Sequence, residues 1–178
     1  EQAVQTNING VQNVIAAASL NDVEIVIFTS SDKAVNPTNV MGTTKLMGER
    51  LMTAANSSKR ENGPIFASTR FGNVLGSSGS VIPIFRNQIS NGGPVTLTDK
   101  KMTRFVMSVE EAVELVLNSV LEAKGGEVFV TKMPVMKIED LAMAMIEELC
   151  TEEMEITEIG SKPGEKLYEE LVSDEETR

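Results

Sequence analysis

Four consecutive residues, Ser30, Ser31, Asp32 and Lys33, offer the clearest acid–base chemistry in this chain of 178 residues. A carboxylate beside an amine can accept and donate protons, and each favours the charged form of the other where both are partly buried. Lys45 follows on the next predicted helix and supplies a second amine. Two other interpretations stay open. These residue types also cluster in ordinary turns, and a serine shortly before a lysine can form a nucleophile pair.

A second candidate feature is the glycine- and serine-rich loop at residues 72–80. Glycine lets the backbone approach a ligand closely, and the predicted helix that follows would present free N–H groups to a phosphate. The loop lacks the Gly-Lys-Ser/Thr ending of a nucleotide-binding P-loop. A flexible connector without a ligand is the alternative interpretation.

Arg104 and the turn at residues 162–166 form a third candidate feature. Arg104 lies in an otherwise apolar stretch, so it needs a partner, either a side chain or a ligand phosphate. Lys162 and Lys166 enclose a Pro-Gly-Glu turn. Solvent-exposed lysines with no ligand are the alternative here.

Apolar periodicity predicts helices that alternate with strands around these residues. The predicted helices cover residues 4–18, 40–56, 80–90, 108–123 and 137–150, and the predicted strands cover residues 23–28, 65–71, 95–97, 127–131 and 155–159. In the helix at 108–123 an apolar stripe is formed by Val113, Val116, Leu117, Val120 and Leu121. The polar end at residues 173–178 is predicted to be frayed.

This alternation indicates an α/β fold with a mostly parallel sheet. In such sheets ligands bind beyond the carboxyl ends of the strands. The loops at residues 29–39 and 72–80 both follow predicted strands, so we expect them to come together there.

The composition excludes several classes of chemistry. Without histidine there can be no Ser-His-Asp triad and no histidine-ligated zinc, and no metal site is predicted. A single cysteine, Cys150, excludes a disulfide within the chain and favours a reducing, cytoplasmic setting. The net charge of −10 argues against nucleic acid or an anionic membrane surface as the main partner. No apolar run approaches the ~18 residues of a membrane span.

Four motifs in order resemble the extended short-chain dehydrogenase/reductase family, and within it the nucleotide-sugar 4,6-dehydratases that act on UDP-N-acetylglucosamine in polysaccharide biosynthesis. They are Phe28–Lys45, Arg70–Ser80, Met102–Phe105 and Pro163–Tyr168. The likeness runs from residue 1 to about residue 172. Four motifs in the right order are more specific than any one of them.

The resemblance implies a Rossmann-like parallel sheet, with NAD or NADP as a tightly bound, recycled cofactor and a UDP-sugar as substrate. Residues 1–79 would form the C-terminal part of the NAD(P)-binding domain. Residues 80–178 would be mostly a substrate-binding region, with the helix at 108–123 returning to the Rossmann layer. A homo-oligomer is expected, built on the helices at 3–19 and 40–56.

The same resemblance implies roles for individual residues. The implied catalytic residues are Asp32 as the acid at the C6 hydroxyl, Lys33 as the base at C5, Ser31 at the 4-oxygen, and Lys45 at the nicotinamide ribose. The implied cofactor-binding residues are Lys45, Met41, Asn73, Val74, Leu75 and Ser30. The implied substrate-binding residues are Asn73, Ile82, Arg104, Lys162 and Glu165, with Arg104 and Lys162 on the phosphates.

The sequence departs from the family pattern in two places. It carries no Gly-x-x-Gly-x-x-Gly turn, so we expect it to be the C-terminal part of a longer protein and inactive alone. The family's catalytic tyrosine, four residues before Lys45, is replaced by Met41, which cannot exchange a proton. A branch of the dehydratases also carries methionine there. A C4 epimerase or reductase and a non-catalytic sugar-nucleotide-binding module stay open as alternatives.

Overall fold

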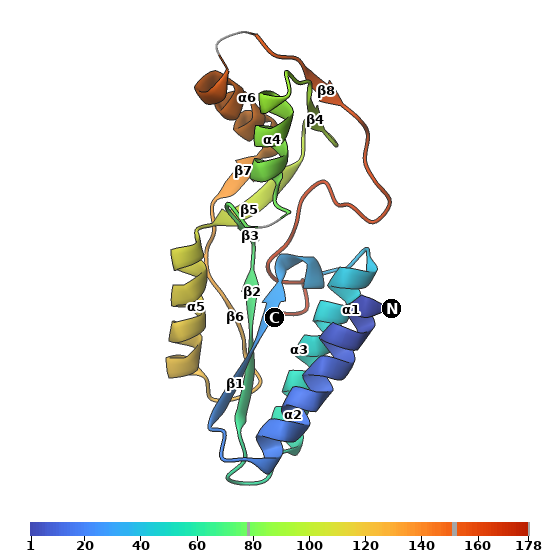
Figure 1. The fold of residues 1–178 in the computed structure, drawn as a ribbon. Coiled ribbons are helices and arrows are strands. Elements are labelled where there is room, and N and C mark those ends of the chain that lie inside the picture. Colours follow the sequence, from blue (N-terminus) through green and yellow to red (C-terminus); the bar gives the residue numbers. More distant parts are fainter. Residues whose placement is uncertain (78, 151–152, 178) are drawn as a thin grey trace. The chain divides into compact units, whose positions relative to one another are not determined.

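The computed structural model describes residues 1–77, 79–150 and 153–177, so Ser78 of the glycine-rich loop and Arg178 lie outside the described residues. The chain divides into two compact units (Figure 1). Unit 1 consists of Glu1–Phe71, Glu110–Lys132 and Glu170–Arg178, and unit 2 of Gly72–Val109 and Met133–Glu169. Each unit is described by itself.

Unit 1 is built on a parallel sheet of three strands in the order β1-β2-β6. The strands are β1 (Ile25–Ser31), β2 (Ile65–Phe71) and β6 (Val128–Val130). The register pairs Ile25 with Ile65 and Ser31 with Phe71, so β1 and β2 end side by side. The predicted α/β class with a parallel sheet is therefore confirmed.

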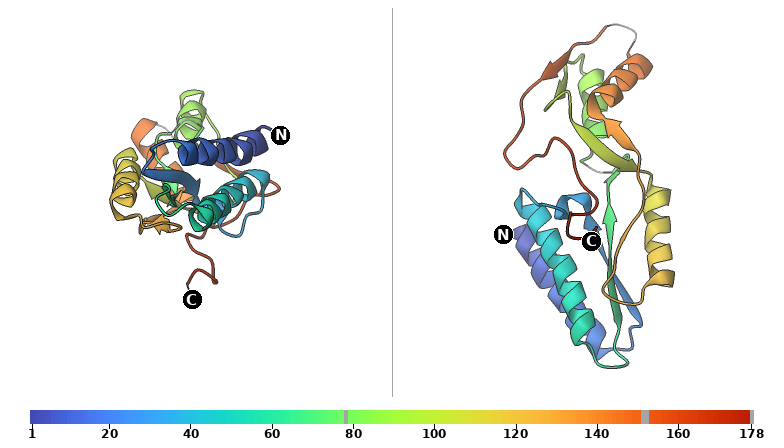
Figure 2. Two further views of the ribbon diagram at one scale, coloured as in Figure 1. Left: turned by 90° about the horizontal axis from the view of Figure 1, so that it is seen from below. Right: turned by 180° about the vertical axis from the view of Figure 1, so that it is seen from behind.

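Helices cover both faces of this sheet, as a parallel sheet requires (Figure 1; Figure 2, right). One face carries α1 (Gln2–Val4), the π-helix η1 (Gln5–Asn9), α2 (Gly10–Leu20) and α3 (Val40–Ser58), and the other carries α5 (Val109–Glu122). A short 3₁₀ helix, η2 (Asp32–Ala34), follows β1. Val11, Ala18, Met52 and Phe66 form the buried core beneath α2 and α3.

Small residues, rather than large ones, bring the helices onto the sheet. Gly42 and Gly48 of α3 are buried, and the ring of Phe28 lies against Gly48. On α5 the buried residues are Ala112 and Ser119. The predicted apolar stripe of this helix is half-buried at Val116 but exposed in this chain at Val113, Leu117, Val120 and Leu121.

Unit 2 contains two small sheets and two helices. In one sheet β3 (Asn73–Val74) pairs in parallel with β5 (Thr103–Met107), which pairs antiparallel with β7 (Val135–Lys137). In the other, β4 (Val95–Leu97) pairs in parallel with β8 (Ile156–Glu158). The helices α4 (Val81–Ser90) and α6 (Ile138–Leu149) close the core, which contains Phe85, Ile89, Val95, Leu97, Met102, Ile138, Ala142 and Met145.

The predicted strand at 23–28 is displaced, because β1 runs on through the polar residues to Ser31. Backbone pairing with β2, rather than apolar content, sets this end of the strand. The strands β3, β5 and β7 were not predicted from the sequence. Within the parts of the chain that the structure describes, none of the helices combines the length and the hydropathy needed to cross a bilayer.

The contact at Gly48 yields a stability prediction. A Cβ atom at this position would lie 2.5 Å from Cζ of Phe28. We expect Gly48→Ala to lower the free energy of unfolding by about 1–3 kcal/mol, because the ring must move in a packed core. Gly10→Ala is the matched helical control, since its added Cβ would lie 3.6 Å from the Gln5 carbonyl oxygen. Urea titration of both variants measures the difference, and equal stability of the two would contradict the prediction.

Candidate active site

Asp32 lies at the carboxyl end of β1, on the first residue of η2, with its side chain fully buried. Its Oδ1 atom accepts a hydrogen bond from Oγ of Ser31 at 2.9 Å and another from Nζ of Lys33 at 3.0 Å. Its Oδ2 atom is buried and has no hydrogen-bond partner among the described residues. A buried carboxylate oxygen without a donor is costly unless a ligand or a proton completes it. The predicted acid–amine pair is therefore in direct contact.

Local turn chemistry explains why the chain bends here. Ser31 caps η2, because its Oγ accepts from the backbone N–H of Lys33 at 3.3 Å. Asn39 caps α3 in the same way and accepts from the backbone N–H of Gly42 at 2.9 Å. A Cβ atom at Gly42 would collide with the carbonyl oxygen of Lys33. Glycine at this position allows α3 to approach the Asp32–Lys33 turn.

Lys45 projects from α3 toward β1. Its Nζ donates to the carbonyl oxygen of Thr29 at 2.8 Å and lies 5.0 Å from the centre of the Phe28 ring. Burial lowers the pKa of the Lys45 amine below its ordinary value. Ser30 is buried, and its Oγ has no hydrogen-bond partner in the described part of the chain. Met41, on the same helix as Lys45, is 42 % exposed.

A second group of predicted residues meets in unit 2. Arg104 is buried on β5, and its Nη1 donates to the carbonyl oxygens of Thr103 at 2.7 Å and Leu167 at 3.2 Å. Its Nη2 lies 3.8 Å from Oε1 of Glu165. Glu165 also accepts from the backbone N–H of Lys162 at 3.5 Å. Three of the predicted substrate residues therefore form one cluster.

The remaining predicted residues lie elsewhere in unit 2. Asn73 and Val74 form β3 and pair with Val106 and Met107 of β5. The backbone N–H of Leu75 donates to the carbonyl oxygen of Met107 at 2.9 Å. Ile82 packs with α4 against the core of unit 2. Because these residues belong to unit 2, their approach to the Asp32 turn stays a prediction.

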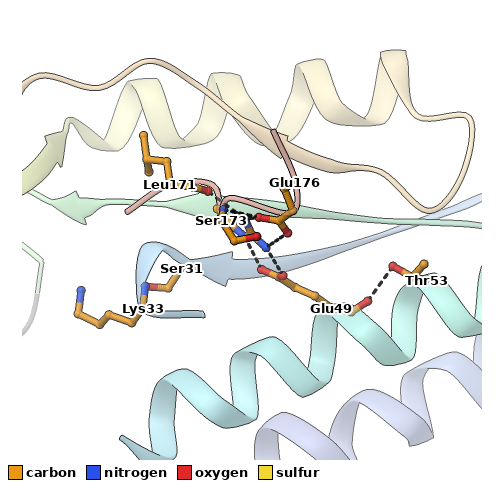
Figure 3. Close-up of polar contacts among 8 residues, drawn as sticks. Ser31, Lys33, Glu49, Thr53, Leu171, Ser173 and Glu176 are labelled. Atoms are coloured by element: carbon orange, nitrogen blue, oxygen red, sulfur yellow. Dashed lines mark hydrogen bonds and ion pairs between the residues drawn. The ribbon is translucent and has the colours of Figure 1, made fainter. Parts of the chain in front are cut away.

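Sequence reasoning missed a buried ion-pair cluster around Arg70. Arg70 and Glu49 are each 1 % exposed, and their side chains form two hydrogen bonds, at 2.9 Å from Nε and 2.7 Å from Nη2. Glu176 accepts two more, at 2.8 Å from Nη1 and 2.7 Å from Nη2 (Figure 3). The carbonyl oxygen of Leu171 accepts from Nη1 at 2.9 Å. An arginine within a buried strand needs a charged or hydrogen-bonding partner. The position of Arg70 in the predicted strand at 65–71 could therefore have indicated a buried ion pair.

This cluster corrects the expectation that residues 173–178 are frayed. Glu176 bonds a buried guanidinium, and its side chain also accepts from the backbone N–H of Ser173 at 2.9 Å. Arg70 lowers the pKa of Glu176 to about 2, through its hydrogen bonds and its charge. Burial alone would lower the pKa of Arg70, but the hydrogen bonds and charges of Glu49 and Glu176 raise it above its ordinary value. Nothing in the sequence indicated that this segment is held in place, because Arg70, to which Glu176 binds, is 106 residues away along the chain.

The side chains of unit 1 fit a dinucleotide's nicotinamide end. The amine of Lys45 and the unpaired hydroxyl of Ser30 are donors of the kind that hold a ribose. The orphan Oδ2 atom of Asp32 offers an acceptor or a proton to a reacting group beside it. These side chains lie at the carboxyl end of a parallel sheet, which is where Rossmann-type α/β folds bind their ligands.

Comparison with known proteins identifies the family. The chain belongs to the polysaccharide biosynthesis protein family, whose model matches residues 1–178. Relatives of the chain are named as nucleotide-sugar dehydratases and epimerases, as the resemblance predicted.

Some relatives are named as dehydratases and others as epimerases. The chain is 43% identical to UDP-N-acetylglucosamine 4,6-dehydratase (inverting) of Campylobacter jejuni, a match that covers 99% of this chain and 52% of the relative. It is 44% identical to UDP-glucose 4-epimerase of Rickettsia rickettsii, over 98% of this chain and 51% of the relative. The chain thus spans about half the length of these two relatives.

Solved structures agree with the fold. The X-ray structure of Pen from Bacillus thuringiensis superposes with a TM-score of 0.94 at 51% identity, covering 99% of this chain and 55% of that one. DesIV, a dTDP-glucose 4,6-dehydratase from Streptomyces venezuelae with NAD bound, shares the fold with a TM-score of 0.84 at 17% identity, over 97% of this chain and 58% of that one.

The lowered pKa of Glu176 yields a pH prediction. A carboxylate whose pKa is lowered on folding stabilises the protein fully above its unfolded pKa and loses that effect as pH falls through the folded value. We expect the stability difference between the wild type and Glu176→Gln to be constant from pH 7 to 5, and to shrink as pH falls from about 4.5 toward about 2. Glu175→Gln is the exposed control from the same segment. Chemical denaturation across pH measures both, and a difference that does not change with pH would refute the assignment.

Proposed function

We propose that the full-length protein containing this chain is an NAD(P)-dependent nucleotide-sugar 4,6-dehydratase that removes water from UDP-N-acetylglucosamine. The observation that carries the proposal is the contact at 3.0 Å between the Lys33 amine and the buried Asp32 carboxyl. Eliminating water requires a base at one carbon and an acid at the departing hydroxyl, and this pair supplies both.

The pair can take part in a balanced proton transfer. Asp32 would give a proton to the hydroxyl that leaves C6, while Lys33, as the neutral amine, would take the proton from C5 and return it to C5 when the hydride adds to C6. The hydrogen bond from Nζ of Lys33 to Oδ1 of Asp32 keeps the two groups side by side. The unpartnered Oδ2 would face the sugar. When bound, the dinucleotide would accept a hydride from C4 and later return it to C6.

The proton of the C4 hydroxyl needs another route, since Met41 stands where the family has its tyrosine. Ser31 would hold the 4-oxygen and pass this proton to the Asp32 carboxylate, because its hydroxyl already donates to Oδ1 of Asp32. The same proton would then leave with the C6 hydroxyl as water. Lys45 would bind the nicotinamide ribose with Met41 and Ser30 beside it. Its Nζ already lies along the end of β1, at the Thr29 carbonyl oxygen.

The unit 2 residues would bind the substrate or the cofactor. Arg104 and Lys162 would bind the phosphates of the UDP-sugar, with Glu165 orienting Arg104. Asn73 and Ile82 would contact the sugar nucleotide, and Val74 and Leu75 the cofactor. The net charge of −10 makes such local cations necessary for an anionic ligand.

Residues 1–79 would belong to the cofactor domain and residues 80–178 mostly to the substrate region, with α5 returning to the Rossmann layer. The protein would be a cytoplasmic homo-oligomer.

A C4 epimerase is the second candidate, and the name of the Rickettsia relative favours it. An epimerase returns the hydride to C4 and expels no water, so the mass of the product decides between the two. The full-length protein is incubated with UDP-N-acetylglucosamine and, separately, with UDP-glucose. Loss of one water from UDP-N-acetylglucosamine supports the dehydratase. An isomer of unchanged mass that separates from the substrate on chromatography supports the epimerase, and binding with recovery of only the unchanged substrate indicates a sugar-nucleotide-binding module.

Replacement of the acid tests the roles. We expect Asp32→Asn in the full-length protein to lower the rate of water loss by about 10²–10⁴-fold, because the amide cannot protonate the leaving hydroxyl. Cofactor binding should persist. Asp22→Asn, an exposed aspartate after α2, is the matched control. Mass analysis of the product follows the reaction, and normal turnover by Asp32→Asn would remove this residue from the mechanism.

Replacement of the helix lysine tests the cofactor site. We expect Lys45→Met to weaken NAD binding about ten-fold, since a charged hydrogen bond to the ribose is lost. Lys59→Met, at the end of the same helix, should bind NAD normally. Isothermal titration calorimetry of both variants in the full-length protein measures the affinity. Equal affinities for the two variants would exclude Lys45 from the site.

A further inference from the structure

The described end of the chain, residues 170–177, is here called the C-terminal strap. It belongs to unit 1 and lies beside the ends of β1 and β2 (Figure 3). Two of the strap's residues, Leu171 and Glu176, accept hydrogen bonds from Arg70 of β2. Arg70 is the register partner of Ser30, so the strap is fastened beside the end of the strand that carries Ser31 and Asp32.

The strap saturates the Arg70 guanidinium. An arginine side chain has five N–H donors. Glu49 accepts from Nε and Nη2, Glu176 from Nη1 and Nη2, and the Leu171 carbonyl oxygen from Nη1. Without the strap, three of these bonds are lost at a residue that is 1 % exposed when the strap is in place. A buried cation that loses its partners is strongly disfavoured, so the attachment of the strap is specific.

The strap has a second link to the same turn. Oε2 of Glu170 accepts from Nδ2 of Asn36 at 2.9 Å. Asn36 is the only non-glycine residue with a positive φ, 44°, in the described part of the chain, and it closes the loop that begins at η2. The loop and the strap, with Leu46, Arg50 and Arg70, line a cavity of about 490 Å³. The loop that follows the Asp32–Lys33 turn is thus held by the C-terminal strap through the Asn36–Glu170 hydrogen bond.

We propose that the C-terminal strap positions the Asp32–Lys33 turn for the reaction, with Glu176 as the positioning residue that fastens it to Arg70. Glu176 contacts no reacting group in this role and acts through Arg70 and the strand end. The kinetic part of the proposal rests on the proposed dehydratase function, whereas the position of the turn can be measured without turnover.

The test compares Glu176→Gln with Glu175→Gln in the full-length protein. A brief pulse of acetic anhydride, followed by peptide mass spectrometry, measures how fast Lys33 is acetylated, with Lys124 as the internal reference. In Glu176→Gln we expect Lys33 to react about three-fold faster or more, because the turn opens locally, while Lys124 is unchanged. The turnover number should fall about ten-fold per bound NAD, with an unchanged KM for the sugar nucleotide. Glu175→Gln, exposed on the same strap, should match the wild type.

Asn36→Gly is the second variant and guards against failure of Glu176→Gln to fold. Glycine keeps the left-handed backbone and removes only the side chain that donates to Glu170. Faster acetylation of Lys33 in either folded variant supports the proposal. Wild-type acetylation of Lys33 in every variant that folds overturns it. If the wild type converts no sugar nucleotide, the proposed function fails, and the acetylation rates still decide the role of the strap.

Discussion

The parallel pairing of β1 with β2 is the constraint on which the rest of unit 1 depends. Its register places Ser31 beside Phe71, so two strands end together and the polar turn begins where the sheet stops. Ser31 and Lys33 both donate to Oδ1 of the buried Asp32 and offset part of the cost of burying it. Close approach of α3 through Gly42 then brings Lys45 to the same strand end. The location of the site therefore follows from backbone pairing, and its side chains supply the chemistry.

Buried charge is the second organising element. A parallel sheet covered by helices on both faces leaves no solvent for an arginine in β2, so Arg70 must find carboxylates within the protein. Glu49 comes from the adjacent helix and Glu176 from the end of the chain. The arrangement ties three distant parts of the sequence to one strand. In unit 2, Arg104 is held by Glu165 and two carbonyl oxygens according to the same principle.

Periodicity predicted most elements of the fold, because long amphipathic helices and apolar strands carry their own signal. The helix at 40–56 corresponds to Val40–Ser58, and the strands at 65–71 and 95–97 match β2 and β4. The short strands β3, β5 and β7 gave no such signal, since tertiary pairing defines them. In α5 the buried residues are the small Ala112 and Ser119, which periodicity did not single out.

The site was predictable where its residues are neighbours in sequence. Adjacent Asp32 and Lys33 indicated acid–base chemistry, and the structure places them in contact. Arg104 and Glu165 were predicted as parts of two separate motifs. Their pairing was not predicted, because the sequence around an arginine does not identify its ion-pair partner. The role of Glu176 was not predicted at all, since the sequence of a polar C-terminal segment does not show whether one of its carboxylates binds a buried cation. Long-range electrostatic partners leave no local pattern to read.

The saturated guanidinium limits which substitutions natural variation can accept. Lysine has three N–H donors on one nitrogen and cannot satisfy two carboxylates and a carbonyl oxygen in a planar fork, so position 70 does not tolerate the usual exchange of basic residues. Loss of either carboxylate would leave two of the five N–H donors of Arg70 without their acceptor. We therefore expect positions 49, 70 and 176 to covary among related sequences, although they are far apart along the chain.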